Sequence, residues 1–366
     1  MKNQESLDAR MIKRALDLAE RGAYTTKPNP KVGAVICHGE DIVAEGWHRQ
    51  AGQPHAEINA LKMAGHRAQG ATLYINLEPC IHVGRTGPCV PALIDSGIQR
   101  VVIAMEDPNP YVAGKGIAAL REAGIQLTIG IGYDQAKKIN EGFVKRMLTG
   151  IPLVRLKMAA TIDGRTAAPD GSSKWISSFE SRADVHHWRA ISSAIVVGIG
   201  TILADDPRLN ARIDEEVVQP IRVVLDSNTR IKPNASLFSE KGEILLVNNS
   251  VKQLDQNTFG SQTETICLPD GNNQVDLESI VRELGARGCN DILIEAGATL
   301  AGNFANTNLV DEYLIYLSPD ILGSKSAGMF CLPNINQLTD RIQLSIEDIT
   351  YFGRDIRLRL RPESIL

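Results

Sequence analysis

Strand and helix signals alternate along nearly the whole chain, and this alternation limits the possible folds more than any other feature. In residues 1–149, the segments KVGAVI, DIVAEGW, ATLYINL, RVVIAM and IQLTIG predict strands, and HAEINALKMAG, PALIDSG and GIAALREAG predict helices. We also expect an opening helix that is capped by Ser6 and ends at Gly22. This spacing is typical of an α/β sandwich with a mostly parallel sheet.

The alternation restarts after residue 149, where Gly150 and Pro152 mark a short linker. Strands are predicted at PLVRLKMAA, SAIVVGIG, IRVVLDS, EILLVNN, TICLP, DILIEAG, DEYLIYLSP and DIRLRLRP, and helices at ESRADVHHWRAIS and LESIVRELGARG. A chain of 366 residues is long for one core and sufficient for two. The sequence therefore predicts two α/β domains, residues 1–149 and 150–366.

Composition excludes several classes of protein. A net charge of −4 is too mild to indicate nucleic acid or a membrane surface as a partner. Apolar runs are too short for a membrane span, and the charged N-terminal segment is unlike a signal peptide. The six cysteines are scattered and do not suggest a disulfide framework. We therefore expect a cytoplasmic protein.

One histidine and two cysteines are spaced for a metal site. His55 and Glu57 form an H-x-E motif at the start of a predicted helix, Cys80 ends a strand, and Cys89 opens another helix. Three such ligands leave the fourth position of tetrahedral zinc open for water, which is the catalytic arrangement. Glu57 is placed to move protons to and from that water, as in zinc-dependent deamination. In the usual deaminase motif two residues separate the cysteines, whereas here eight do.

Other interpretations of these residues stay open. Cys80 and Cys89 could be buried free cysteines. A closed structural zinc site, as in a zinc-stabilised binding or scaffold protein, would need a fourth ligand, for which Cys37 and His82 are candidates. The first domain alone would also permit a nucleoside or tRNA deaminase with an unrelated C-terminal domain.

Longer stretches of both halves match one known family. They are PNPKVGAVI, GWHRQAGQPHAEINAL, LEPCIHVGRTGPC, EDPNPYVAGKGIAALREAGI, KMAATIDGRTA, SKWIS, HHWRA, VGIGTILADDPRLNAR and IEAGATLAG. On these stretches the chain resembles the bifunctional deaminase/reductase family of riboflavin biosynthesis. The resemblance implies a cytidine-deaminase-like α/β/α sandwich followed by a dihydrofolate-reductase-like α/β domain. It also implies zinc-dependent deamination of a phosphorylated diaminopyrimidine, then NADPH-dependent reduction of its ribosyl group. Separately, we expect a homo-oligomer, because loops from two such domains commonly need partners.

The resemblance implies roles for residues of the first half. His55, Cys80 and Cys89 would hold Zn²⁺, and Glu57 would be the catalytic proton shuttle. The remaining substrate contacts fall into two groups. Asn29 and His48 would line the pyrimidine pocket, and the phosphate would be read from the long loop between the cysteines by His82, Arg85 and Thr86.

The second half is less decisive without the resemblance. The turn in ILIEAGATLAGNF leads from a strand into a helix, whose first N–H groups could hold a phosphate. The resemblance implies substrate contacts by Ser173, Arg189, Leu209, Arg212 and Glu295. It implies NADPH contacts by Ala159, Trp175, Thr201, Asp205, Ser227, Gly297, Ala298, Thr299, Leu300, Ala301, Gly302 and Asn303. Lys157, Asp205 and Glu295 are all candidates for the proton donor.

Overall fold

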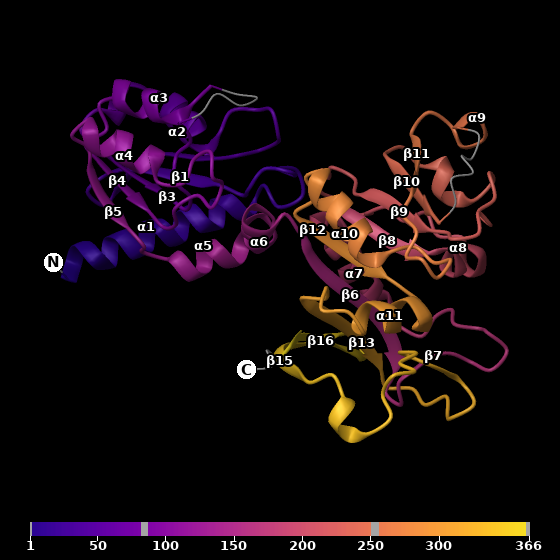
Figure 1. The fold of residues 1–366 in the computed structure, drawn as a ribbon. Helices are drawn as coiled ribbons and strands as arrows, with labels where there is room; N and C mark the ends of the chain where they lie inside the picture. Colours follow the sequence, from indigo (N-terminus) through magenta and orange to yellow (C-terminus); the bar gives the residue numbers. More distant parts are fainter. Residues whose placement is uncertain (1, 82–86, 250–255, 364–366) are drawn as a thin grey trace. The chain divides into compact units, whose positions relative to one another are not determined.

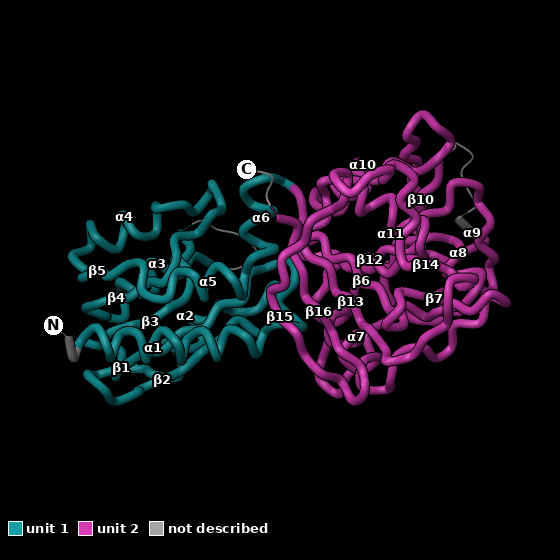
Figure 2. The backbone as a smooth tube through the Cα atoms, turned by 90° about the horizontal axis from the view of Figure 1, so that it is seen from below, with its two compact units in different colours: residues 1–150 teal, residues 151–366 magenta. Residues whose placement is uncertain are grey.

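The computed structural model describes residues 2–81, 87–249 and 256–363. The chain divides into two compact units, residues 1–150 and 151–366, which Figure 2 colours separately. Each unit has its own sheet and its own core. Among the described residues, no helix combines the length and the apolar character that crossing a membrane requires.

Unit 1 is built on a five-stranded sheet. Its strands are β1 (Gly33–His38), β2 (Asp41–Trp47), β3 (Thr72–Ile75), β4 (Arg100–Ile103) and β5 (Gln126–Ile129), in the order β2-β1-β3-β4-β5. The pairs β3–β4 and β4–β5 are parallel, whereas β1 pairs antiparallel with both β2 and β3. The expected mostly parallel sheet is therefore wrong for this unit, because a hairpin forms two of its strands.

Helices cover both faces of this sheet (Figure 1). They are α1 (Lys2–Glu20), α2 (Ala56–Ala64), α3 (Cys89–Asp95), α4 (Lys115–Glu122), α5 (Tyr133–Ile139) and α6 (Glu141–Thr149), with the 3-10 turn η1 (Gly65–Ala68). One core joins the sheet to α2, α3 and α4, and the other joins it to α1, α5 and α6. The predicted N-cap at Ser6 is wrong, because α1 already begins at Lys2. Residues 2–5 contain no proline or glycine that would delay the start of the helix until Ser6.

Two glycines of the β1–β2 hairpin allow helices to approach closely. A Cβ atom at Gly33 would lie 2.1 Å from the carbonyl oxygen of Ala15 on α1, and one at Gly46 would lie 2.4 Å from that of Ala56 on α2. Any side chain at Gly46 would therefore push α2 away from the sheet. This contact matters because the first turn of α2 carries the H-x-E motif.

Unit 2 contains a nine-stranded sheet in the order β11-β10-β9-β8-β12-β6-β13-β16-β15. Its strands are β6 (Leu153–Thr161), β8 (Ala194–Gly198), β9 (Ile221–Leu225), β10 (Ile244–Asn248), β11 (Thr263–Cys267), β12 (Asp291–Glu295), β13 (Glu312–Ser318), β15 (Leu344–Phe352) and β16 (Asp355–Pro362). The strands from β11 to β13 are parallel, and only β16 and β15 are antiparallel. A separate small ribbon pairs β7 (Arg165–Ala167) with β14 (Ala327–Gly328).

Helices again lie on both faces of the sheet. The described helices are α7 (Phe179–Ile191), α8 (Ile199–Asp205), α9 (Gln256–Phe259), α10 (Leu277–Ala286) and α11 (Ala298–Ala305), with 3-10 turns η2 (Ser236–Ser239) and η3 (Leu338–Asp340). α10 and α11 pack on one face, and α7 and α8 on the other. The carboxyl ends of β6, β8, β9 and β12 therefore open at one edge, where open α/β sheets bind ligands.

Candidate active sites

The three predicted metal ligands of unit 1 lie together. The Nδ1 atom of His55 is 3.4 Å from Sγ of Cys80 and 3.3 Å from Sγ of Cys89. All three ligand atoms lie within 4.8 Å of one another. Tetrahedral zinc with bonds of about 2.0–2.3 Å holds such nitrogen and sulfur ligands about 3.5 Å apart. The cluster therefore fits a zinc ion without rearrangement.

Main-chain hydrogen bonds join the two ends of the long segment between Cys80 and Cys89. The carbonyl oxygen of Cys80 accepts hydrogen bonds from the first two N–H groups of α3, those of Cys89 (3.0 Å) and Val90 (3.2 Å). These contacts return Cys89 to Cys80 despite the eight residues between them. His55 is likewise the N-cap of α2, so two helix N-termini meet at the cluster. Their dipoles favour the thiolate form of the cysteines.

A buried carboxylate fixes the approach to Cys80. Glu78 is 3% exposed and accepts main-chain hydrogen bonds from Asp107 (3.1 Å), Gly114 (3.0 Å) and Ile117 (3.0 Å). It ties the segment after β3 to the segment that enters α4. Glu78 therefore fixes the main chain two residues before Cys80, and it is not one of the three clustered ligands.

Glu57 lies next to the metal cluster and is almost fully buried. The residue is 3% exposed, and its Oε2 atom has no hydrogen-bond partner in the described part of the chain. Burial, with a smaller contribution from the charge of Cys80, raises the pKa of Glu57 to about 7. A buried carboxylate with an unoccupied acceptor atom and a near-neutral pKa suits proton transfer.

The predicted pyrimidine contacts form a connected pair beside His55. Nδ2 of Asn29 lies 3.0 Å from Nε2 of His48, whose Nδ1 lies 3.2 Å from the carbonyl oxygen of Pro54. An amide nitrogen donates and a carbonyl accepts, so Nδ1 carries the proton and Nε2 accepts. Burial lowers the pKa of His48, which favours the neutral ring. The ring packs edge-on against His55, with 5.2 Å between centroids.

Of the two candidates for a fourth zinc ligand, Cys37 and His82, the structure describes only Cys37. Cys37 lies in β1 with its sulfur 3.5 Å from Met11 in the core, and it is not part of the metal cluster. His82, Arg85 and Thr86 fall outside the described residues, so their predicted phosphate contacts stay predictions.

Asp107 was missed by the sequence analysis. It is a buried carboxylate close enough to Cys80 to feel its charge, and burial raises its pKa to about 7. The signal in the sequence was its place four residues after β4, beyond the carboxyl end of a parallel strand.

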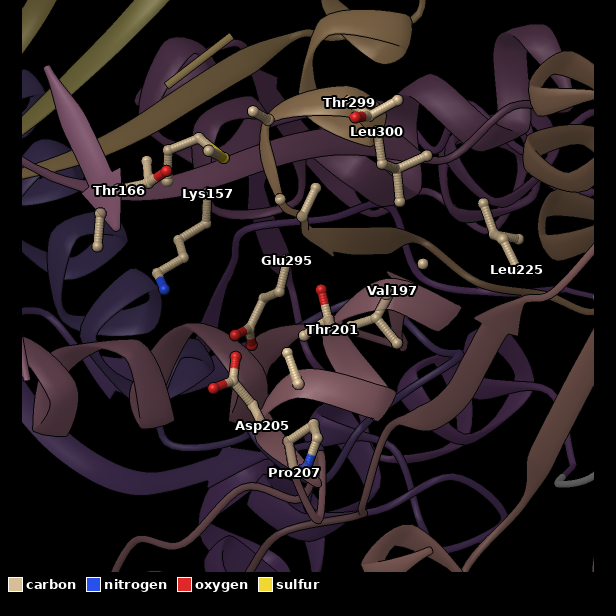
Figure 3. A pocket seen from close by; sticks show the side chains of 18 of the residues that line it. Lys157, Thr166, Val197, Thr201, Asp205, Pro207, Leu225, Glu295, Thr299 and Leu300 are labelled. Atoms are coloured by element: carbon tan, nitrogen blue, oxygen red, sulfur yellow. The ribbon is translucent and has the colours of Figure 1, made fainter. Parts of the chain in front are cut away.

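Unit 2 contains a large cavity at the carboxyl ends of its parallel strands. The cavity has a volume of about 1820 Å³ and is lined by residues from β6, α7, α8 and the segments that follow β8, β9 and β12. Figure 3 shows Lys157 on the left of the view and Leu225 on the right, with Glu295 and Asp205 near the centre and Thr299 and Leu300 above them. The N-terminus of α11 therefore lines the cavity together with these charged residues.

Most predicted contacts of unit 2 line this cavity. They are Ala159, Ser173, Trp175, Arg189, Thr201, Asp205, Leu209, Arg212, Ser227, Glu295, Gly297, Ala298, Thr299, Leu300 and Asn303. Ala301 and Gly302 do not line it. Both are buried on the opposite side of α11, where a Cβ at Gly302 would lie 1.9 Å from the carbonyl oxygen of Cys331.

The charged residues of the cavity are strongly coupled. Nε and Nη2 of Arg189 donate to the two carboxylate oxygens of Glu295, at 2.5 and 2.9 Å. Burial alone would raise the pKa of Glu295, but the Arg189 guanidinium overcomes it and lowers the pKa to about 2. Burial lowers the pKa of Lys157, whose ammonium feels the charges of both Glu295 and Asp205. Glu295 is therefore a fixed anion, whereas Lys157 can release a proton.

Two exposed aromatic side chains, Trp175 and Phe179, line the cavity. Trp175 is 68% exposed, and the guanidinium carbon of Arg182 lies 4.4 Å from its ring centroid. Arg182 and Phe179 also line the cavity but were not predicted, nor was His186. The available signal was helical spacing, because these residues precede Arg189 on α7 by multiples of three to four positions.

Comparison with known proteins agrees with both sites. Residues 5–105 match the cytidine and deoxycytidylate deaminase zinc-binding region, and residues 152–358 match the RibD C-terminal domain. The chain is 45% identical to riboflavin biosynthesis protein RibD of Haemophilus influenzae, over 98% of this chain and 99% of that protein. The chain belongs to the RibD family. It is a bifunctional enzyme of riboflavin biosynthesis that joins a deaminase to a reductase.

Solved structures of RibD share this fold. Acinetobacter baumannii RibD has a TM-score of 0.92 and 40% identity, covering 98% of this chain and all of that one. The Thermotoga maritima diaminohydroxyphosphoribosylaminopyrimidine deaminase/5-amino-6-(5-phosphoribosylamino)uracil reductase has a TM-score of 0.88 and 32% identity, with 98% and 100% covered. The expected two-domain fold is thus confirmed, and a deaminase with an unrelated C-terminal domain is not favoured, because residues 152–358 match the RibD C-terminal domain.

Proposed function

We propose that unit 1 deaminates 2,5-diamino-6-(5-phosphoribosylamino)pyrimidin-4(3H)-one and that unit 2 reduces the product, 5-amino-6-(5-phosphoribosylamino)uracil, with NADPH. The observation that carries the first step is the cluster of three ligands, His55, Cys80 and Cys89, that the described residues form beside the buried acceptor atom of Glu57. A zinc ion bound there would supply an activated water, which is the chemistry hydrolytic deamination needs.

Glu57 moves the protons of this step. Its carboxylate accepts a proton from the attacking water and returns it to the departing amino group. A carbon–oxygen bond forms, the carbon–nitrogen bond breaks, and ammonia leaves. Asn29 and His48 position the pyrimidine ring, because their linked hydrogen bonds fix the donor and acceptor directions of the pocket wall.

The cavity of unit 2 suits the second step. NADPH would supply the hydride, with its pyrophosphate near the N-terminus of α11, where Gly297 provides no side-chain cap for the first N–H groups. The residues around Lys157 and Glu295 lie to one side of that point, which leaves room for the ribose of the substrate next to the nicotinamide.

Lys157 is the best candidate for the proton donor in the reduction. Glu295 is held as an anion by Arg189, and the carboxylate of Asp205 lies 3.3 Å from Nζ of Lys174. The side chain of Lys157 extends into the cavity (Figure 3), and burial lowers its pKa so that it releases a proton more readily than a free lysine. It would deliver that proton to the oxygen that the opening ribose ring leaves behind.

The two steps are tested in one experiment. The purified protein is incubated with the diaminopyrimidine substrate, with and without NADPH, while ammonia release and NADPH absorbance are followed. We expect ammonia in both reactions and NADPH oxidation only after ammonia has appeared. Turnover of cytidine or tRNA adenosine, without turnover of the diaminopyrimidine, would refute the proposal.

A further inference from the structure

The two arginines that line the cavity have different partners. Arg189 forms the bidentate ion pair with Glu295, and its Nη1 also donates to the carbonyl oxygen of Asn210 at 3.2 Å. Arg212 instead contacts neutral groups, since its Nη1 donates to Oδ1 of Asn210 at 2.6 Å. Within the described part of the chain, no carboxylate lies within ion-pair distance of Arg212. The positive charge of Arg212 is therefore available to an anionic ligand.

His186 provides the other contacts of Arg212. Nδ1 of His186 lies 3.2 Å from the main-chain N–H of Arg212, and Nε2 lies 2.9 Å from Nη2 of the same residue. Each ring nitrogen thus lies beside a donor of Arg212, and the main chain of Asn210 is a further hydrogen-bond partner of the ring. A ring nitrogen can accept from Arg212 only when it carries no proton. Burial and the charges of Arg189 and Arg212 lower the pKa of His186 to about 4, which favours the neutral ring.

A neutral imidazole accepts only one hydrogen bond. His186 therefore accepts from the main-chain N–H or from the guanidinium of Arg212, and not from both. Arg212 is an exposed residue, so its guanidinium can turn to a phosphate oxygen in the cavity and form charge-assisted hydrogen bonds. The main-chain contact is the one that a ligand need not disturb, so His186 can hold the backbone of Arg212 while the guanidinium turns to the phosphate.

We propose that His186 is a positioning residue that holds Arg212 for the phosphate of the reductase substrate. This inference rests on the proposed function of unit 2 and adds to it a division of labour. Arg212, supported by His186 and Asn210, binds the phosphate, whereas Arg189 fixes Glu295 near the ribose. The substrate and NADPH both carry phosphates, and the experiment distinguishes them.

The test compares His186→Ala, His186→Gln, Arg212→Ala and the double variant His186→Ala/Arg212→Ala. NADPH oxidation is measured with the deaminated substrate, varying each reactant in turn, and inorganic phosphate is added as an inhibitor. We expect His186→Ala to raise KM for the substrate about fivefold to tenfold, as for loss of support to one charge-assisted contact, with kcat and KM for NADPH unchanged. His186→Gln should recover most of the loss, because its amide oxygen can accept from Arg212.

If His186 acts by positioning Arg212, we expect two further results. The double variant should be no worse than Arg212→Ala alone, because the support is useless without the arginine. Inorganic phosphate should compete with the substrate and not with NADPH, and His186→Ala should weaken that inhibition. His187→Ala is the matched control, since His187 is adjacent on α7 but does not line the cavity.

Other outcomes would overturn the inference. Additive effects in the double variant would show that His186 acts independently of Arg212. A raised KM for NADPH would assign Arg212 to the cofactor, and an unchanged KM for both reactants would exclude a positioning role. Failure of the wild-type protein to oxidise NADPH with this substrate would instead refute the proposed function, which is a separate result.

Discussion

The Arg189 guanidinium and the Glu295 carboxylate form a two-pronged ion pair, with N–O distances of 2.5 and 2.9 Å and with side chains only 12% and 11% exposed. They are 106 positions apart in the chain, on α7 and at the end of β12. The pair thus links a helix to the sheet at the wall of the reductase cavity. Both residues were predicted as substrate contacts, but each is also the principal partner of the other.

Breaking this pair should cost both stability and reduction. Arg189→Ala leaves the buried Glu295 carboxylate without its counter-charge, and such losses are worth about 3–5 kcal/mol. We expect urea denaturation to show that the free energy of unfolding of unit 2 falls by this amount. NADPH oxidation should be lost, whereas ammonia release should be unchanged.

A surface ion pair provides the control. Arg282 and Glu278 are 2.6 Å apart with side chains 59% and 58% exposed, so Arg282→Ala should change stability by less than about 1 kcal/mol. Wild-type stability in Arg189→Ala would mean that Glu295 finds another partner or a proton.

The pH dependence of the reduction should report Lys157. A proton donor must be protonated, and burial lowers the pKa of this lysine below its ordinary value. The kcat for NADPH oxidation should therefore decline as pH rises through this lowered pKa, earlier than an ordinary lysine would titrate. Glu295, with a pKa of about 2, should add no acidic limb in the working range.

Substitution of Lys157 tests whether this residue causes the decline of kcat at alkaline pH. Lys157→Ala should lower kcat by about 10²–10⁴-fold, the usual size of general acid catalysis, and remove the alkaline limb. Lys157→Arg should keep the charge but release no proton, so its kcat should stay low and independent of pH. An alkaline limb that persists in Lys157→Ala would assign proton donation to another group.

Local patterns in the sequence account for most of the fold but not all of it. The strand at β15 was missed because Glu347 and Asp348 interrupt its apolar residues, and a bulge between Ile346 and Asp348 shifts the alternation. α5 and α6 were missed as well, since both are short and carry many charged residues. The parallel strands of unit 2 were visible because burial on both faces makes them continuously apolar.

The same distinction applies to the sites. The metal ligands were predictable because H-x-E stands at the start of a helix and Pro-Cys follows a strand. The expectation that Cys80 ends that strand is wrong, because β3 already ends at Ile75, five residues earlier. The contact of His186 with Arg212 joins residues 26 positions apart, and no local spacing encodes it. Such pairings depend on how α7 packs beside the segment after α8, which is a property of the whole unit.

The metal cluster should hold one zinc per chain. Cys89→Ser removes a soft ligand from a three-ligand site, so metal content measured by mass spectrometry and ammonia release should both be lost. Cys37→Ser is the matched control, because Cys37 is a buried core cysteine outside the cluster and should retain both. Full deaminase activity in a zinc-free preparation would exclude the zinc mechanism, and zinc loss in Cys37→Ser would favour a closed structural site.

The two activities should separate at Glu57. Glu57→Gln keeps the size of the side chain but removes the proton acceptor, so ammonia release should fall by about 10²–10⁴-fold. Neutralising a carboxylate that is 3% exposed should not weaken the fold, because burial already disfavours its charge. The variant should still bind zinc, since Glu57 is not among the three ligands. It should also oxidise NADPH at the wild-type rate when given the deaminated substrate, because unit 2 has its own sheet and its own cavity.

The assay tests the Glu57→Gln and Arg189→Ala variants with each of the two substrates. If Glu57→Gln lost both activities while circular dichroism and zinc content matched the wild type, the assignment of one reaction to each unit would be wrong.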